Sequence, residues 1–213
     1  MSKLPLFALT VGLIVVRGAA GVQAGVAAER HAVVNVRIYN YAEVPTSALQ
    51  AARLEAARIF ERAGLASNWE ICRIRESVNV PDDPACAGPA GSNVFAVRVV
   101  SDVTHSHSDR PVPDVLGYAV ISPEHVGILA TVLFQRVCDL AERSRTDTTT
   151  LLARVMAHEV GHLVIGSNKH ARTGIMRAVW KLDPTGPSEA TEWKFSQEEV
   201  AQMRRRVADV SGN

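Results

Sequence analysis

Hydrophobic and polar residues alternate at the start of the first segment that has a regular pattern. Apolar side chains occupy every second position from residue 34 to residue 38, which is the period of a strand with one buried face. The pattern predicts a strand over residues 32–40. From residue 45 to residue 63 apolar residues recur at helical spacing instead, and Gly64 is placed to end that helix. A long first helix is therefore expected directly after the first strand.

Short runs rich in β-branched residues follow this helix and are separated by turn-forming stretches. They predict further strands at residues 68–74, 94–103, 116–122 and 127–134, with loops at 81–91 and 104–114. The last of these runs also fits the beginning of a helix, which the pattern at residues 135–143 suggests. Strands and helices thus alternate along the chain, and nothing in the sequence marks a second domain.

Two more helices are expected in the C-terminal part of the chain. Apolar residues surround nearly the whole circumference of a helix over residues 151–165, and Asp147 is well placed as its N-cap. A helix that is apolar on all sides is buried. Ser196 and Glu199 form the pattern of a capping box, which predicts a final helix over residues 197–208.

The first 28 residues have the pattern of a secretory signal peptide. A basic start precedes an apolar run at residues 4–16, and small residues with candidate cleavage sites follow at 18–28. Arg17 leaves the apolar run shorter than the roughly 20 residues that a membrane-spanning helix needs. We therefore expect a secreted or periplasmic protein, a single catalytic domain at residues 29–213, and no stable membrane insertion after signal cleavage.

Composition limits the classes of function that the chain can have. Its 213 residues are 47% hydrophobic and 21% charged, with a formal net charge of +1, so they can bury one sizeable core. This balance gives no electrostatic bias toward nucleic acid or anionic membranes. The sequence has no glycine-rich loop to suggest phosphoryl transfer, no Ser/His/Asp order to suggest serine hydrolysis, and no basic-aromatic pattern to suggest nucleic acid as a partner. It does not indicate an oligomeric state.

Three cysteines are compatible with an oxidising compartment. Cys72 and Cys86 flank a segment rich in proline and aspartate, and a disulfide between them would close a short irregular excursion. Cys138 is then left over. The alternative is three reduced thiols, because spacing alone does not determine pairing.

The buried helix carries two histidines and a glutamate at a characteristic spacing. His158 and His162 lie one turn apart on a common face, and Glu159 lies just beside that pair. Imidazole nitrogens suit Zn²⁺, and a catalytic zinc site uses three protein ligands so that another position can hold water. The adjacent glutamate can accept a proton from that water as a general base. His-Glu-x-x-His on a helix is the known signature of this arrangement.

A third ligand is expected from the residues after the helix. Gly166 can end the helix in a left-handed conformation and return the chain across the helix end, which makes His170 the natural candidate. Three downstream acids compete with it, because a carboxylate can also bind zinc: Asp183, Glu189 and Glu192.

The segment from His158-Glu159-Val160-Gly161-His162 through Gly166 and His170 ends in Gly174-Ile175-Met176. In this order it resembles the metzincin zinc endopeptidases. The resemblance implies three zinc-binding histidines and a tight turn in which Met176 forms an apolar floor. The spacing is wider than in the usual metzincin motif. Gly166 comes four residues after His162, and His170 comes eight residues after His162. The segment is also similar to uncharacterised secreted bacterial proteins, so the resemblance implies a divergent branch.

The resemblance implies an α+β fold with which the order of strands and helices is compatible. The expected architecture is a twisted mixed sheet of four or five strands with a long first helix, a buried zinc-binding helix and a C-terminal helix. It also implies that one strand, 116–122 or 127–134, pairs with an extended substrate.

Two functions follow from these features. The first is a secreted zinc endopeptidase that acts on a peptide or protein substrate, with Glu159 as general base. The alternative is a non-catalytic exported protein that uses a metal to support its fold. Glu159 favours the first, because a structural metal site has no need of a carboxylate beside an open coordination position.

Overall fold

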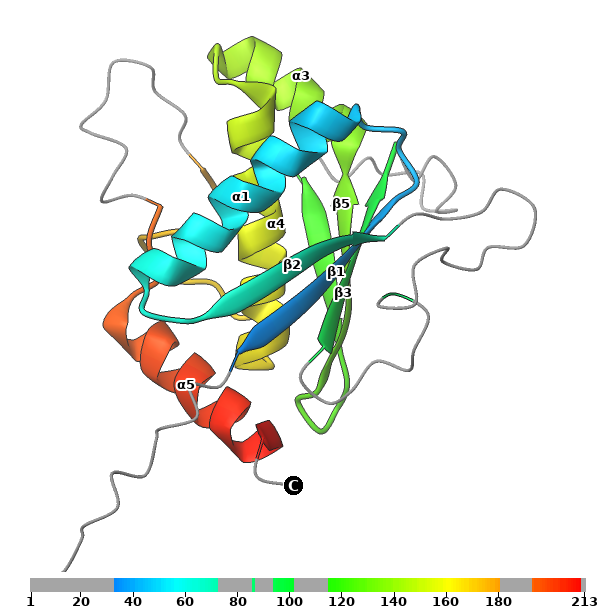
Figure 1. Ribbon diagram of the computed structural model, residues 1–213. Coiled ribbons are helices and arrows are strands. Elements are labelled where there is room, and N and C mark those ends of the chain that lie inside the picture. The colour runs from blue at the N-terminus through cyan, green and yellow to red at the C-terminus, as the bar shows by residue number, and fades with distance from the viewer. Residues whose placement is uncertain (1–32, 73–85, 87–93, 102–114, 181–192, 212–213) are drawn as a thin grey trace, which may run out of the picture. The chain divides into compact units, whose positions relative to one another are not determined.

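The structure is a computed structural model that describes residues 33–72, 86, 94–101, 115–180 and 193–211 (Figure 1). The chain divides into two units, residues 1–30 and residues 31–213, and every described residue belongs to the second. The segment predicted to be a signal peptide lies outside the described residues. None of the helices in the described ranges has the length and hydrophobicity needed to cross a membrane.

The described residues of the second unit form one five-stranded sheet and four helices. In chain order these are β1 (Val34–Asn40), α1 (Thr46–Arg62), β2 (Ser67–Cys72), β3 (Val94–Val100), β4 (Gly117–Ile121), β5 (Gly127–Leu133), α3 (Phe134–Ser144), α4 (Thr148–Ile165) and α5 (Gln197–Ser211). The predicted mixed sheet, long first helix, buried helix and C-terminal helix are all confirmed.

The sheet has the strand order β2-β1-β3-β5-β4. The first four strands of this order pair in parallel, and β4 pairs antiparallel with β5. Both long sides of β5 are therefore occupied by neighbouring strands, whereas β4 lies at an edge of the sheet. Of the two strands considered for substrate pairing, β4 is thus the one with an outer edge.

Helices α1 and α4 pack on the same face of the sheet, and the core lies between them and the strands (Figure 1). The alternating residues of β1 explain why, because Val34, Val36 and Ile38 are buried while the intervening side chains are partly exposed. In α4 every residue from Leu151 to Ile165 is buried. The central helix therefore has protein around its whole circumference, as its apolar pattern predicted.

Both ends of α4 are fixed by the residues that the sequence suggested. The Asp147 side chain accepts a hydrogen bond from the Thr150 backbone N–H at 2.7 Å. At the other end Gly166 has φ of 71° and donates its N–H to the His162 carbonyl. A left-handed residue at this point turns the chain sharply back toward the helix, and glycine adopts that conformation without steric cost. The Ser196–Glu199 capping box of α5 is also present, with both reciprocal hydrogen bonds.

Some boundaries differ from those that the pattern predicted. Strand β3 ends at Val100 rather than at residue 103, and α5 continues to Ser211 rather than ending at residue 208. The ambiguous stretch after residue 127 contains both elements, because β5 runs directly into α3 at Phe134. The β-branched residues before this point and the helical spacing after it were each a correct signal.

Candidate metal centre

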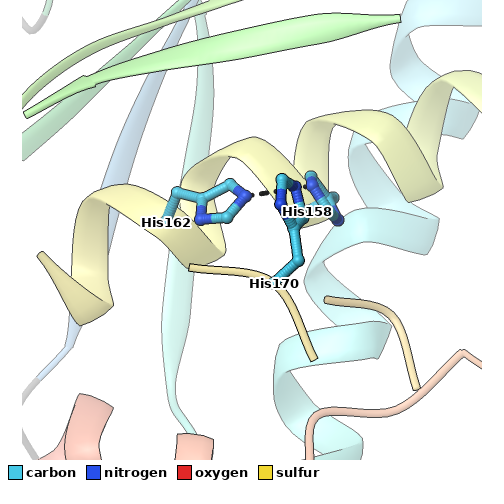
Figure 2. A group of neighbouring side chains, drawn as sticks. All are labelled: His158, His162 and His170. Atoms are coloured by element: carbon cyan, nitrogen blue, oxygen red, sulfur yellow. Dashed lines mark hydrogen bonds between the residues drawn. The ribbon is translucent and has the colours of Figure 1, made fainter. Parts of the chain in front are cut away.

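His158 and His162 lie side by side on α4 with their imidazole rings in edge-on contact. Their exposed fractions are 7% and 3%, and their Nε2 atoms are 3.0 Å apart. Figure 2 shows both rings on the same side of the helix. The four-residue spacing produces this pairing, since residues i and i+4 are neighbours on a helix surface.

Backbone carbonyls determine which ring nitrogens are free. His158 Nδ1 lies 2.7 Å from the Ile175 carbonyl oxygen, and His162 Nδ1 lies 2.7 Å from the Ser167 carbonyl oxygen. A carbonyl only accepts, so each Nδ1 carries the proton and donates it. In the neutral rings both Nε2 atoms then present lone pairs to each other. A cation between or beside them satisfies this arrangement.

Protonation of one ring would also satisfy the close contact between the two Nε2 atoms, but burial makes protonation unfavourable. Burial lowers the pKa of His158 to about 3, with a further contribution from His162. Burial also lowers the pKa of His162 to about 4. Both imidazoles are therefore neutral near pH 7, which is the form in which histidine binds a metal.

The loop after α4 brings His170 to the same place. Its ring stacks on His158 at a centroid distance of 5.3 Å and lies edge-on to His162 at 4.9 Å. One nitrogen from each of the three rings can be chosen so that all lie within 4.8 Å of one another. Three histidines are thus positioned to bind one metal ion (Figure 2).

Hydrogen bonds made by residues 166–177 hold this loop in place. The Ala171 N–H donates to the Met176 carbonyl at 2.8 Å, and the Ile175 N–H donates to the Lys194 carbonyl at 3.0 Å. Gly174 has φ of 76°, and a Cβ there would lie 2.6 Å from that same Lys194 oxygen. Glycine is therefore required in the turn that presents Ile175 to His158.

The sequence offered three acids as alternatives to His170. Asp183, Glu189 and Glu192 all fall in residues 181–192, outside the described ranges. The distances among the nitrogen atoms of the three histidines do not depend on the positions of these acids.

Glu159 lies beside His158 with its carboxylate almost completely buried. Its exposed fraction is 4%, and burial raises the pKa of the carboxyl to about 8. Within the described part of the chain it makes no hydrogen bond or ion pair. A buried carboxyl group without a hydrogen-bond partner costs folding free energy in either protonation state, so this position is not explained by stability.

A cavity of about 530 Å³ opens next to Glu159 and two of the histidines. Its wall combines the beginning of β4, one side of α3, the middle of α4 and the residues that follow Met176. The lining residues nearest the histidines are His158, Glu159, His170, Gly117, Arg177 and Trp180. His158, His170 and the Glu159 carboxylate therefore face a space large enough for part of a ligand.

Met176 lies under the helix turn that separates the two histidines. It is 1% exposed, and a Cβ built at Gly161 would lie 2.7 Å from Met176 Sδ. The thioether thus packs directly against α4 between His158 and His162. The apolar floor that the sequence resemblance implied for Met176 stays a prediction.

Replacing Met176 by Leu is expected to have a small effect. The exchange roughly conserves volume and should cost less than about 1.5 kcal/mol of the free energy of unfolding, with no loss of bound metal. Met176→Ala, which leaves a cavity, should cost about 2–5 kcal/mol. Denaturant unfolding and metal analysis of both variants test this, and a loss of metal in the Leu variant would show that the sulfur itself is needed.

Sequence reasoning missed a cluster of aromatic and basic side chains against His158. The Trp180 ring lies 5.5 Å from His158 and 4.9 Å from Trp193, both edge-on. Arg154 is 5% exposed, and its Cζ lies 4.1 Å from the centroid of Trp193. A long basic residue in a fully buried helix was the available signal for such a partner, but the tryptophans come from outside the helix and have no fixed spacing to it.

The structure joins Cys72 and Cys86 in a disulfide, with a Cα–Cα distance of 5.7 Å. Cys138, on α3, is a free cysteine. The bond connects the last residue of β2 to a residue 14 positions further along the chain. It is compatible with an oxidising compartment.

Comparisons with known proteins give limited similarity. No protein-family model matches the chain, and no curated protein matches it significantly. A zinc-dependent peptidase from Methanocorpusculum labreanum is similar in structure, with a TM-score of 0.47, 16% identity, and coverage of 79% of this chain and 99% of that chain. An archaemetzincin from Methanopyrus kandleri has a TM-score of 0.47 and 15% identity, with coverage of 85% and 99%. The function of this chain must therefore be argued from its own site.

Proposed function

We propose that this protein is a secreted, zinc-dependent endopeptidase of a divergent metzincin-like type. The observation that carries the proposal is the Glu159 carboxylate, buried and without a partner in the described structure, beside three converging histidines at the wall of a cavity. A carboxylate kept in such a place at a cost to stability has a chemical role rather than a structural one.

The histidine site fits zinc. Three neutral imidazoles offer the nitrogen ligands that Zn²⁺ prefers, and the Nδ1 hydrogen bonds of His158 and His162 leave their Nε2 lone pairs available. Zinc bound there supplies Lewis acidity, which lowers the pKa of a water molecule and polarises a carbonyl. Three protein ligands are the number found in catalytic zinc sites, whereas structural sites use four.

Glu159 supplies the proton transfers of hydrolysis. Its carboxylate accepts a proton from the attacking water, and it then donates that proton to the nitrogen of the leaving amine. In the metal-free chain burial raises the pKa of this carboxyl to about 8, and a carboxyl with a raised pKa is suited both to accept and to return a proton. Glu159 lines the cavity, so a substrate bound there has direct access to it.

Strand β4 provides a place for an extended peptide. It is at the edge of the sheet, and Gly117 at its start lines the cavity together with Leu116 just before it. A peptide that adds to this edge by backbone hydrogen bonds passes next to Glu159. Backbone pairing of this kind does not depend on the substrate's side chains, as suits an endopeptidase.

Export is part of the proposal because of the N-terminal pattern and the disulfide. Residues 1–28 have the composition of a cleaved signal peptide, and the Cys72–Cys86 bond persists in an oxidising compartment. The mature protein is then secreted or periplasmic.

Metal analysis combined with a hydrolysis assay tests the proposal. Purified mature chain should contain close to one zinc ion, and it should hydrolyse fluorescein-labelled casein or members of a peptide mixture. Chelation should abolish this hydrolysis, and added zinc should restore it. Zinc binding without hydrolysis of any peptide would instead favour the non-catalytic alternative, and protein that stays metal-free after zinc is added would contradict both.

A further inference from the structure

Gly117 is the first residue of β4, and the space that its side chain would occupy is filled by Glu159. A Cβ built at Gly117 would lie 2.8 Å from Glu159 Oε1 and 3.0 Å from Glu159 Cγ. Cβ atoms do not approach other atoms this closely. Any other residue at position 117 must therefore displace the carboxylate, the strand or both.

The register of the sheet explains this contact. Gly117 pairs with Val132 of β5, which is completely buried on the side of the sheet that faces the helices. A side chain at position 117 would point to that same face, toward α4. Glycine leaves a bare stretch of backbone there instead, and the Glu159 carboxylate lies against it.

Packing has to position this carboxylate, because hydrogen bonds do not. Glu159 has no hydrogen-bond partner among the described residues, and three torsion angles connect its carboxylate to the helix backbone. Contacts with neighbouring atoms are then what restrict its rotamer. Gly117 supplies one side of the slot in which the carboxylate lies beside the histidines.

We infer that Gly117 is a positioning residue of this site, which keeps the Glu159 carboxylate in place by having no side chain. The inference rests on the proposed function, because the position of Glu159 affects a rate only where Glu159 takes part in the reaction. A misplacement of about 1 Å in a catalytic group can lower a rate by about 10²-fold.

Packing of the strand itself is a competing explanation for this glycine. The same Cβ would lie 2.7 Å from the Thr131 carbonyl oxygen of β5, so an alanine disturbs the sheet as well as Glu159. Gly127, the first residue of β5, offers a matched control. A Cβ there would lie 2.5 Å from the Leu163 carbonyl oxygen, one turn further along α4, and Glu159 is not among its nearest neighbours.

Kinetics of Gly117→Ala and Gly127→Ala, each measured below its unfolding temperature, form the first test. With a fluorogenic peptide chosen from a mixture screen, we expect Gly117→Ala to lower kcat by about 10–100-fold, while KM stays within about threefold. Zinc content should be unchanged, because no ligand is touched. Gly127→Ala should retain kcat within about threefold. Equal losses of kcat in the two variants would overturn the inference.

The second test compares the Tm of each glycine variant in the wild-type background with its Tm in the Glu159→Ala background, using metal-free protein. Gly117→Ala should lower Tm by at least about 3 °C more in the wild-type background than in Glu159→Ala, where the crowding is relieved. Gly127→Ala should lower Tm equally in both backgrounds. Equal shifts for Gly117→Ala would overturn the inference, as would failure of Gly117→Ala to fold in both backgrounds. If it folds only with Glu159→Ala, the inference is supported.

The two tests separate this inference from the proposed function. A wild-type chain that hydrolyses no peptide contradicts the proposed function, whatever the thermal coupling. Absence of thermal coupling in a chain that does hydrolyse peptides contradicts only the role of Gly117.

Discussion

Replacing Glu159 by Gln is expected to lower kcat by about 10²–10⁴-fold without loss of zinc. The amide has nearly the shape of the carboxylate but cannot accept a proton from water. Zinc should remain because the three histidines are untouched. Hydrolysis of a fluorogenic peptide and zinc analysis on the same preparation measure both quantities. Unchanged activity in this variant would exclude Glu159 as the general base.

The same variant separates a chemical role of Glu159 from a structural one. The pKa of this carboxyl is raised from 4.5 to about 8 in the folded chain, so the unfolded chain binds fewer protons between these values and ionisation destabilises the fold. In metal-free protein at neutral pH, Glu159→Gln should therefore unfold at the same temperature as wild type or at a higher one. A marked loss of stability would indicate a structural role instead.

Loss of one histidine is expected to abolish metal binding and, with it, hydrolysis. His158→Ala leaves two ligands, and its effect on zinc affinity should exceed the roughly 10–100-fold cost of changing a residue that only supports a ligand. His170→Ala should be comparable, because its ring lies nearly as close to the other two as they lie to each other, with centroid distances of 5.3 and 4.9 Å against 4.6 Å. Competition with a chelator measures the zinc affinity of each of the three variants, His158→Ala, His162→Ala and His170→Ala.

Lys169→Ala is the matched control for His170, because Lys169 is exposed on the same loop. It should retain zinc affinity. Replacement of Glu189 or Glu192 should also have little effect if histidine is the third ligand. Retention of zinc by His170→Ala, together with its loss on replacing either glutamate, would contradict the histidine assignment while leaving a zinc hydrolase in place.

Local patterns along the chain predicted most elements of this fold but not their arrangement. Alternation around Val36 and helical spacing around Ala56 depend on nearest neighbours in sequence, and both β1 and α1 were found where these patterns indicated. The order of the strands depends on which distant segments pair. Nothing in β5 itself indicates that it lies between β3 and β4.

Part of the candidate site could be predicted from local sequence and part could not. His158 and His162 lie one helix turn apart and Glu159 lies beside them, so their convergence follows from helix geometry. The carbonyls of Ser167 and Ile175, which orient the two rings, have no sequence signature because every residue has a carbonyl.

Gly117 did leave a detectable signal that was not used. An isolated glycine inside a strand pattern often marks a close approach of backbone to another group. Only the sheet register, however, shows that the approaching group is Glu159.

All three histidines and the carbonyls that orient two of them fall within residues 158–175. The longest loop that must close to assemble them spans 17 residues, from His158 to Ile175. Loops of about 10 residues close in roughly 10–100 ns, whereas parallel strand pairing joins distant segments and is intrinsically slow. The metal centre is thus a local structure within a non-local fold. We expect an isolated peptide of residues 147–177 to bind zinc measurably, though more weakly than the whole domain, because the sheet no longer holds the helix.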